Sequence, residues 1–279
     1  MEKALQLIKN SPYIISQDSW HYVEKQIHKI LSYKRIEKII LLPKNIQFID
    51  TACSTTTIAV GIVGWTVWTM MDDIRDEKIN DTQILYVYSV LRPIMDEFIH
   101  SLKMPDQHLD CIRKIIGTME YANSDMCTFS VSEKDIFKSI GATVPMIMLL
   151  VNIGANQKNI DLCYAYFYHF IGARQLSDDA LDWPEDMKKG HRTLVTEWFK
   201  EAAGNGKSIK EYRKFSNDIV APKVDNKILW HARKSIGYAR QITCFKSTEP
   251  LEELPKFYED MATELIAKRK DRKLKKIPK

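Results

Sequence analysis

Apolar residues recur at three- and four-residue intervals along most of the chain, among charged and polar residues. This spacing is typical of amphipathic helices, because about 3.6 residues make one helical turn. It predicts helices at residues 22–31, 34–42, 57–75, 82–102, 106–128, 132–151, 161–183, 227–242 and 255–272. No run alternates apolar and polar positions as a half-buried strand does, so the pattern predicts an all-α protein.

Several residues mark where these helices start or stop. Ser132, with Asp135 three residues later, predicts a capped helix start. Pro184 is expected to kink or end its helix, because proline lacks a backbone N–H and crowds the preceding turn. Residues 203–206 and 216–226 are predicted to be loops.

Glycine and proline are sparse, with ten of each among 279 residues, which suits long helices better than a turn-rich β architecture. A chain of this length can bury a substantial core in one large domain. We therefore expect a single helical domain over residues 1–279.

Residues 52–71 contain no charge and are long enough to span a membrane. The segment is nevertheless rich in threonine and runs directly into Asp72 and Asp73. A buried core helix that ends at a polar cavity accounts for both features, and this is the interpretation we favour.

The net charge of +5 is concentrated in a basic tail at residues 268–279, which holds eight basic residues and one acid. The rest of the chain is therefore slightly acidic, which argues against a nucleic-acid partner. The tail is interpreted either as a solvated terminus or as a site for anions, namely diphosphate or the headgroups of a membrane surface.

Five cysteines are scattered without a CxxC pair, which favours a reducing compartment and argues against a structural zinc site or a disulfide framework. The first residues contain no apolar run of the kind found in a signal peptide. These two observations lead us to expect a cytoplasmic protein.

Two clusters of aspartates with DDxxD spacing carry the candidate chemistry. The first consists of Asp72, Asp73 and Asp76, and the second of Asp178, Asp179 and Asp182. Within a helix this spacing crowds like charges on one face, which destabilises the helix unless a cation offsets the repulsion. One such cluster is typical of a solvated acidic face, but two copies on apolar helices predict a shared site for Mg²⁺, which prefers oxygen ligands and keeps positions for phosphates.

Each cluster follows a stripe of apolar residues at helical spacing. Trp65 and Trp68 precede the first cluster, and Phe167 and Ile171 precede the second. A pocket with a metal-binding rim and an apolar, partly aromatic interior fits a prenyl diphosphate, because aromatic faces stabilise an allylic cation. Several Mg²⁺ ions would stabilise the departing diphosphate.

The segment Gln175-Leu176-Ser177-Asp178-Asp179-Ala180-Leu181-Asp182 resembles the second aspartate-rich motif of trans-prenyl diphosphate synthases, QxxDDxxD. The segment Lys138-Ser139-Ile140-Gly141-Ala142 is similar to the lysine helix of that family, whose lysine contacts diphosphate. The region from Asp182 through Asp186 to Gly190 also resembles squalene and phytoene synthases. The resemblance implies a class I isoprenoid synthase: a helical bundle around a central apolar cavity, forming a homodimer.

The resemblance extends the list of candidate site residues. Asp186 is added to the two clusters as a metal ligand. The candidates for substrate binding are Lys138, Arg174, Gln175, Lys188, Lys189 and Arg192, together with the four apolar residues Trp65, Trp68, Phe167 and Ile171.

The chain departs from the chain-elongating synthases in two places. Those enzymes carry an Arg-Arg pair after the first motif, whereas Glu77-Lys78-Ile79-Asn80-Asp81 stands here, and their upstream segment for isopentenyl diphosphate is only faintly matched at residues 33–36. This favours a terpene synthase that ionises one C10–C20 prenyl diphosphate. The alternatives are a prenyltransferase, by head-to-tail elongation or by coupling, and a non-catalytic partner subunit of a prenyl synthase.

Overall fold

Two long helices, α5 (Thr51–Asp76) and α10 (Gln157–Lys189), organise the computed structural model of the chain. The structure describes residues 1–46, 51–76, 82–124 and 126–275, with the backbone alone at 34–35, 51–54, 72–76 and 272–275. Over these ranges the chain is helical and contains no β-strand, so the all-α prediction is confirmed.

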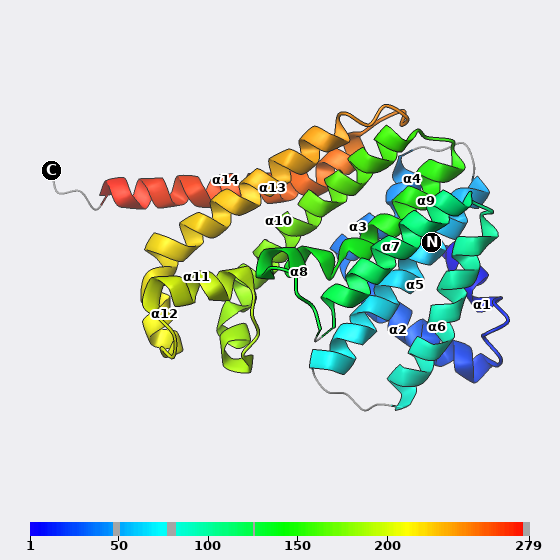
Figure 1. Cartoon of the computed structure of the whole chain (residues 1–279), viewed down its shortest axis with the longest axis horizontal. Helices are drawn as coiled ribbons and strands as arrows, with labels where there is room; N and C mark the ends of the chain where they lie inside the picture. The colour runs from blue at the N-terminus through cyan, green and yellow to red at the C-terminus, as the bar shows by residue number, and fades with distance from the viewer. Residues whose placement is uncertain (47–50, 77–81, 125, 276–279) are drawn as a thin grey trace.

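The remaining helices pack around these two (Figure 1). In chain order they are α1 (Glu2–Lys9), α2 (Gln17–Leu31), α3 (Lys34–Ile40), α4 (Leu42–Asn45), α6 (Thr82–Ser101), α7 (Asp106–Ala122), α8 (Val131–Phe137), the 3₁₀-helix η1 (Ile140–Thr143), α9 (Val144–Asn152), α11 (Leu194–Ala203), α12 (Ile209–Phe215), the π-helix η2 (Ser216–Val220), α13 (Ala221–Ala239) and α14 (Glu249–Lys275). Helices α1 to α9 form the broad end of the bundle, whereas α11, α12 and the adjoining parts of α13 and α14 form a narrow end.

Helix α5 is a core helix, as its apolar sequence predicted. Ala59, Val60, Val63 and Val67 are fully buried, and α6 and α9 pack against the helix. Over its described side chains, residues 55–71, the apolar stretch is mostly buried in protein, as the sequence interpretation expected.

Among the described residues, no single helix has both the length and the apolar character needed to cross a membrane. One bent pair, Val131–Phe137 with Ile140–Asn152, meets those two limits when taken together.

The helix predicted at residues 132–151 is divided in the structure. Ser130, not Ser132, begins α8: it accepts a hydrogen bond from the backbone of Glu133, whose carboxylate accepts one from Ser130 in return. The prediction of Ser132 and Asp135 as the cap was therefore wrong. Asp135 is turned into the protein, and α9 starts afresh with Pro145 in its first turn, where a missing N–H has no cost.

Helix α10 continues through Pro184 to Lys189, so a stop at that residue was wrong, and the kink that the sequence offered as the other outcome stays a prediction. Trp183 stacks on Phe199 of α11, with ring centroids 4.0 Å apart, and this packing supports the helix beyond the proline. The helix ends at Gly190, whose φ of 76° is the left-handed conformation that glycine adopts without strain. As a result, Asp178, Asp182 and Asp186 stand on consecutive turns of one continuous helix.

Helix α13 covers the outer side of α10. Ser235 donates a hydrogen bond to the Tyr166 carbonyl at 3.0 Å, and the Nδ1 atoms of His169 and His231 lie 3.0 Å apart, so one ring donates to the other. The predicted loop at residues 216–226 was wrong, because η2 and the first turn of α13 occupy it.

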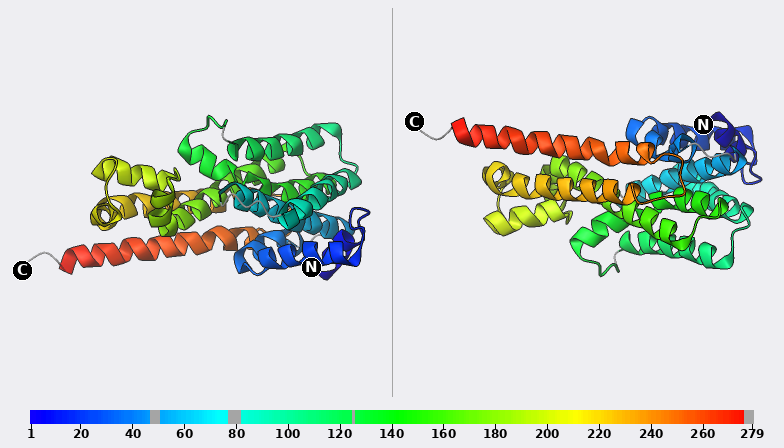
Figure 2. Two further views of the ribbon diagram at one scale, coloured as in Figure 1. Left: turned by 90° about the horizontal axis from the view of Figure 1, so that it is seen from below. Right: turned by 90° about the horizontal axis from the view of Figure 1, so that it is seen from above.

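Helix α14 continues past the bundle and projects from the narrow end (Figure 2). It carries the start of the basic tail, but Arg269 turns inward and forms an ion pair with Asp225, a residue that is only 3% exposed. The side chains from 272 onward, which hold most of the tail's charge, lie outside the described residues.

Candidate functional site

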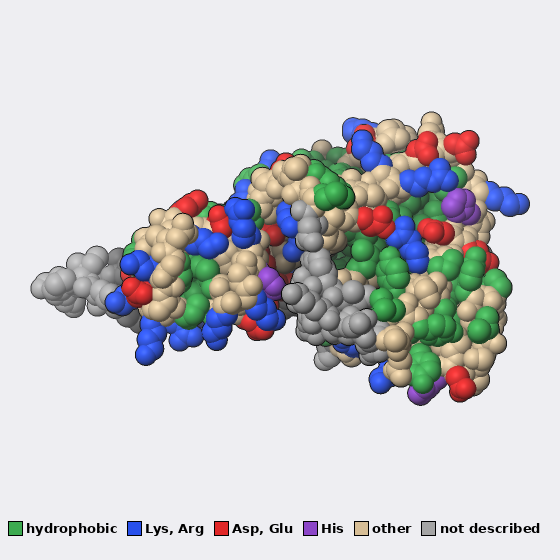
Figure 3. Space-filling model, turned by 60° about the horizontal axis from the view of Figure 1, so that its bottom comes forward, with side chains coloured by type: hydrophobic (Ala, Val, Ile, Leu, Met, Phe, Trp, Pro, Cys, Tyr) green, Lys and Arg blue, Asp and Glu red, His purple; other side chains and the backbone are tan. Residues whose placement is uncertain are grey.

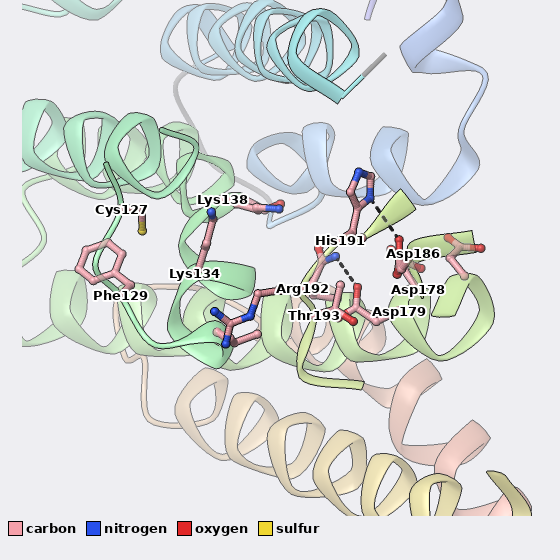
Figure 4. Close-up of a pocket in the computed structure, with 15 residues that line it drawn as sticks. Cys127, Phe129, Lys134, Lys138, Asp178, Asp179, Asp186, His191, Arg192 and Thr193 are labelled. Carbon is pink, nitrogen blue, oxygen red and sulfur yellow. Dashed lines mark hydrogen bonds and ion pairs between the residues drawn. The ribbon is translucent and has the colours of Figure 1, made fainter. Parts of the chain in front are cut away.

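A cavity of about 590 Å³ lies beside the last turns of α10 (Figure 4). Helix α8 and the segment after α10 supply its other walls. Its lining comprises Cys127, Phe129, Val131, Lys134, Lys138, Ser139, Gln175, Asp178, Asp179, Asp182, Asp186, Gly190, His191, Arg192 and Thr193. Figure 3 shows acidic, basic and histidine side chains side by side where the narrow end joins the main bundle.

The acidic wall of the cavity is a stripe on α10. Asp178, Asp182 and Asp186 are spaced four residues apart, which places them one above another on the same face of the helix. The side chain of Asp178 is 37% exposed and that of Asp186 16% exposed. Glu185 does not line the cavity and pairs with Lys189 at 2.9 Å. The unbroken helix is therefore what brings Asp186 into the site.

Asp179 has a different environment from its neighbours. It is only 4% exposed, and its Oδ1 accepts a hydrogen bond from Gln175 Nε2 at 2.9 Å. Its Oδ2 is buried without a hydrogen-bond partner among the described residues. Burial, followed by the nearby carboxyl of Asp135, raises the pKa of Asp179 to about 8. A buried carboxyl with an unpaired oxygen is a group whose charge requires a cation beside it.

Basic residues form the opposite wall. Lys134 comes from α8 and Lys138 from its C-cap, and His191 and Arg192 come from the segment after α10. Arg192 is largely exposed and lies 3.3 Å from Glu197, whereas His191 Nδ1 lies 3.5 Å from Asp186 Oδ1. The cavity thus sets cations against carboxylates, an arrangement suited to an anion that binds together with metal ions.

Asp135 is a part of this region that the sequence analysis took for a helix cap. It is 5% exposed and accepts a hydrogen bond from the Leu194 backbone N–H at 3.1 Å, which ties α8 to the start of α11. Burial raises its pKa to about 6. A second cavity, of about 20 Å³, has Asp135, Asp179 and His231 among its walls. That volume is enough for one water molecule behind the second motif.

Sequence reasoning also missed Lys134, whereas His191 was among the basic residues after the second motif that could reach a diphosphate. Lys134 stands four residues before Lys138, so helical spacing was the available signal. His191 reaches the cavity because Gly190 turns the chain, a local conformation that no periodic pattern encodes.

Arg174 lies just outside the lining, between the two motif-bearing helices. Its Nη2 is 3.5 Å from Asp178 Oδ2, and its guanidinium carbon is 5.3 Å from the ring centre of Trp65 on α5. The predicted substrate-binding residues Lys188 and Lys189 are exposed and do not line the cavity.

The four apolar candidates are all buried, and none of them lines the described cavity. Trp65 and Trp68 pack edge to face, with ring centroids 6.4 Å apart. Phe167 and Ile171 point from α10 into the hydrophobic core of the bundle. The predicted apolar interior of the site therefore stays a prediction.

The first aspartate cluster occupies the last turns of α5. The helical backbone extends through Asp76, as expected, but the side chains of Asp72, Asp73 and Asp76 lie outside the described residues. In Figure 1, α5 and α10 run in the same direction, so both motifs lie toward the same end of the bundle.

The described side chains include no group of three acids, histidines or cysteines close enough to hold a metal ion by themselves. Hard oxygen donors are nevertheless present, and the unpaired Asp179 oxygen is the kind of atom that a cation satisfies. The residues present therefore fit Mg²⁺ shared between protein and substrate, since Mg²⁺ commonly takes only one or two carboxylates and completes its shell with water and phosphate.

Comparison with known proteins gave matches of structure alone. No protein-family model matches the chain, and no curated protein matches it. Geranylgeranyl pyrophosphate synthetase from the archaeon Geoglobus acetivorans is 16% identical, with 92% of this chain and 94% of that chain covered and a TM-score of 0.67. Geranylgeranyl pyrophosphate synthase from Corynebacterium glutamicum, complexed with isoprenyl diphosphate and magnesium, is 13% identical over 92% and 96% of the two chains, with a TM-score of 0.63.

A decaprenyl diphosphate synthase from Rhodobacter capsulatus is 11% identical, with 96% of this chain and 95% of that chain covered and a TM-score of 0.61. The match extends over nearly the whole length of each of these structures. The chain therefore has the fold of the trans-prenyl diphosphate synthases, which confirms the fold that the sequence resemblance implied.

Proposed function

We propose that this chain, which shares its fold with prenyl diphosphate synthases, is a Mg²⁺-dependent prenyltransferase acting on an allylic prenyl diphosphate. The observation that carries the proposal is the cavity itself, where the Asp178–Asp182–Asp186 stripe of α10 faces Lys134 and Lys138 at the C-terminal end of α8. A diphosphate with its metal ions matches both walls at once, whereas a neutral ligand would leave both sets of charges unused.

Magnesium enters the proposal because a structural neighbour was solved with isoprenyl diphosphate and magnesium, and because the acidic stripe supplies oxygen ligands. Asp178, Asp182 and Asp186 would hold the metal from α10, and Asp72, Asp73 and Asp76 are the candidates on α5. When bound, Mg²⁺ would stabilise the negative charge that develops on the diphosphate as its bond to the allylic carbon breaks.

The basic wall would hold the diphosphate. Lys134 in α8 and Lys138 at its C-cap are four residues apart and can donate to neighbouring phosphate oxygens. Arg192 would leave its ion pair with Glu197 and bind the diphosphate instead, because an ion pair at the surface is weak. These donors would orient the substrate and keep the departing diphosphate in place.

The fate of the allylic cation after ionisation decides between prenyl transfer and terpene synthesis. The neighbours named above are prenyl diphosphate synthases, which favours prenyl transfer over the terpene synthase that the sequence departures suggested. One observation keeps the terpene synthase as a second candidate: the arginine pair of chain-elongating enzymes is absent after the first motif, where residues 77–81 stand.

The experiment that tests the proposal is incubation with geranyl, farnesyl and geranylgeranyl diphosphates and Mg²⁺, with and without isopentenyl diphosphate, followed by mass spectrometry. Longer diphosphates formed only with isopentenyl diphosphate support elongation, and dimeric products support coupling. Hydrocarbons or alcohols formed from one substrate would replace prenyl transfer by terpene synthesis. Absence of turnover with every substrate would contradict an enzymatic role and favour the non-catalytic subunit.

A further inference from the structure

Arg174 is the residue that connects the acidic stripe to the helix of the first motif. It lies one turn before Asp178 on α10, and its Nη2 is 3.5 Å from Asp178 Oδ2. On its other side, the guanidinium carbon lies 5.3 Å from the ring centre of Trp65 on α5. With 20% of its side chain exposed, the guanidinium is partly withdrawn from water and is held by partners on two helices.

The aromatic support of Arg174 is firmly packed. Trp65 is 7% exposed and meets Trp68 edge to face. Trp68 in turn packs closely against Gly64 and Gly141, where an added Cβ atom would stand 2.9 Å and 2.4 Å from its ring. Because Trp65 is buried against this closely packed Trp68 ring, its face is a fixed support for the guanidinium beside Asp178.

A guanidinium at this place has opposite effects on the two ligands of the proposed site. It places a positive charge next to a carboxylate of the acidic stripe. It therefore repels a divalent cation that approaches Asp178 alone and attracts the diphosphate that arrives with such cations. Both effects are strengthened because the Arg174 side chain is only 20% exposed, so water screens its charge less than at an open surface.

We propose that Arg174 is a positioning residue that weakens metal binding to the substrate-free site and strengthens binding of diphosphate together with its metals. This inference rests on the proposed function, because it assumes that Asp178 binds metal and that a diphosphate binds beside it. Its consequence is an order of loading: the acidic stripe fills when substrate and Mg²⁺ come together, not with Mg²⁺ alone.

The test uses Arg174→Gln in the full-length protein, with Mn²⁺ and inorganic pyrophosphate as the probes. Mn²⁺ binding without an anion, followed by electron paramagnetic resonance, is expected to tighten about three- to tenfold, because a repelling charge has gone. Pyrophosphate binding at saturating Mg²⁺, followed by calorimetry, is expected to weaken about tenfold. Arg174→Lys keeps the charge and should stay within about threefold of the wild type for both probes.

Arg233→Gln is the matched control. Arg233 lies on α13, its Nε is 3.1 Å from Glu259 Oε1 on α14, and it does not line the cavity. This variant should leave both affinities at the wild-type value. Far-ultraviolet circular dichroism establishes that each variant retains its helical content, so that a folding defect is not read as a change in affinity.

The opposite signs of the two changes decide the inference. Weakening of both probes in folded Arg174→Gln would show a purely structural role and overturn it, as would affinities that do not change. If the wild type itself binds neither Mn²⁺ nor pyrophosphate, the proposed function fails before Arg174 is at issue. The two failures are thus distinct.

Discussion

Replacement of Asp179 by asparagine should make the ligand-free protein more stable while it damages the site. The carboxyl is 4% exposed, one of its oxygens has no partner among the described residues, and burial raises its pKa from 3.8 to about 8. At pH 7 the unfolded chain holds this group ionised, whereas the folded protein holds it mostly protonated. The pKa difference acting between 3.8 and 7 destabilises the fold by about 4 kcal/mol at most.

Asparagine removes this penalty and can still accept the hydrogen bond from Gln175. Its amide N–H₂ would take the place of the unpaired oxygen, and a buried donor without a partner costs about 1–3 kcal/mol. The expected net gain for Asp179→Asn at pH 7 is therefore about 2 kcal/mol. Because folding raises the pKa of Asp179, this carboxyl costs the wild type no free energy of unfolding at low pH. The cost develops as pH rises from 3.8 toward 8.

Urea unfolding of both proteins at pH 5, 6, 7 and 8, without Mg²⁺, measures the effect. The advantage of Asp179→Asn over the wild type should grow by about 2–3 kcal/mol between pH 5 and pH 7. Asp178→Asn is the control, because the half-exposed Asp178 pairs with Arg174 and should give no gain. An Asp179→Asn protein that is no more stable than the wild type at any of these pH values would refute the reasoning.

Three further predictions concern the basic wall, the histidine pair and the tail. Lys138→Gln should raise the KM for a prenyl diphosphate about tenfold, because a charge-assisted contact to phosphate is lost, and steady-state kinetics measures it; an unchanged KM would remove Lys138 from the site. Burial, then the proximity of His169, lowers the pKa of His231 to about 3, so the wild type should lose about 2–3 kcal/mol relative to His231→Gln as pH falls from 6.5 to 4.5. Parallel stability curves for those two proteins in urea would contradict the buried, neutral state of His231. Deletion of residues 272–279 removes five basic residues and should abolish binding to vesicles containing anionic lipid, measured by co-sedimentation, if the tail contacts membranes; full binding after deletion would exclude that role.

The helical class and most helix positions followed from the apolar pattern, because burial of one face sets the spacing along a helix. Helix ends followed less well. Pro184 is a local helix breaker, but the stacking of Trp183 on Phe199 joins two helices and cannot be read from the residues next to the proline. The same holds for residues 216–226, which are polar and proline-containing yet helical where they pack beside α11 and α12.

Spacing predicted a shared site around the second motif, and the structure brings seven of the candidates to one cavity: Lys138, Gln175, Asp178, Asp179, Asp182, Asp186 and Arg192. Spacing could not show that Asp179 is buried while Asp178 is half-exposed, because that difference depends on α8 packing against α10. It also could not reveal Asp135, whose neighbours in space are Leu194 and Asp179, 44 or more residues away in sequence.

The central claim is that the acidic stripe of α10 supports Mg²⁺-dependent cleavage of an allylic diphosphate. Pyrophosphate release from farnesyl diphosphate in the presence of isopentenyl diphosphate, measured with Mg²⁺ and with excess chelator for the wild type and Asp178→Asn, tests it most directly. The account predicts release by the wild type with Mg²⁺ only, and a rate lower by about a hundredfold or more in Asp178→Asn. Equal release by both proteins, or release that persists in the chelator, would contradict it.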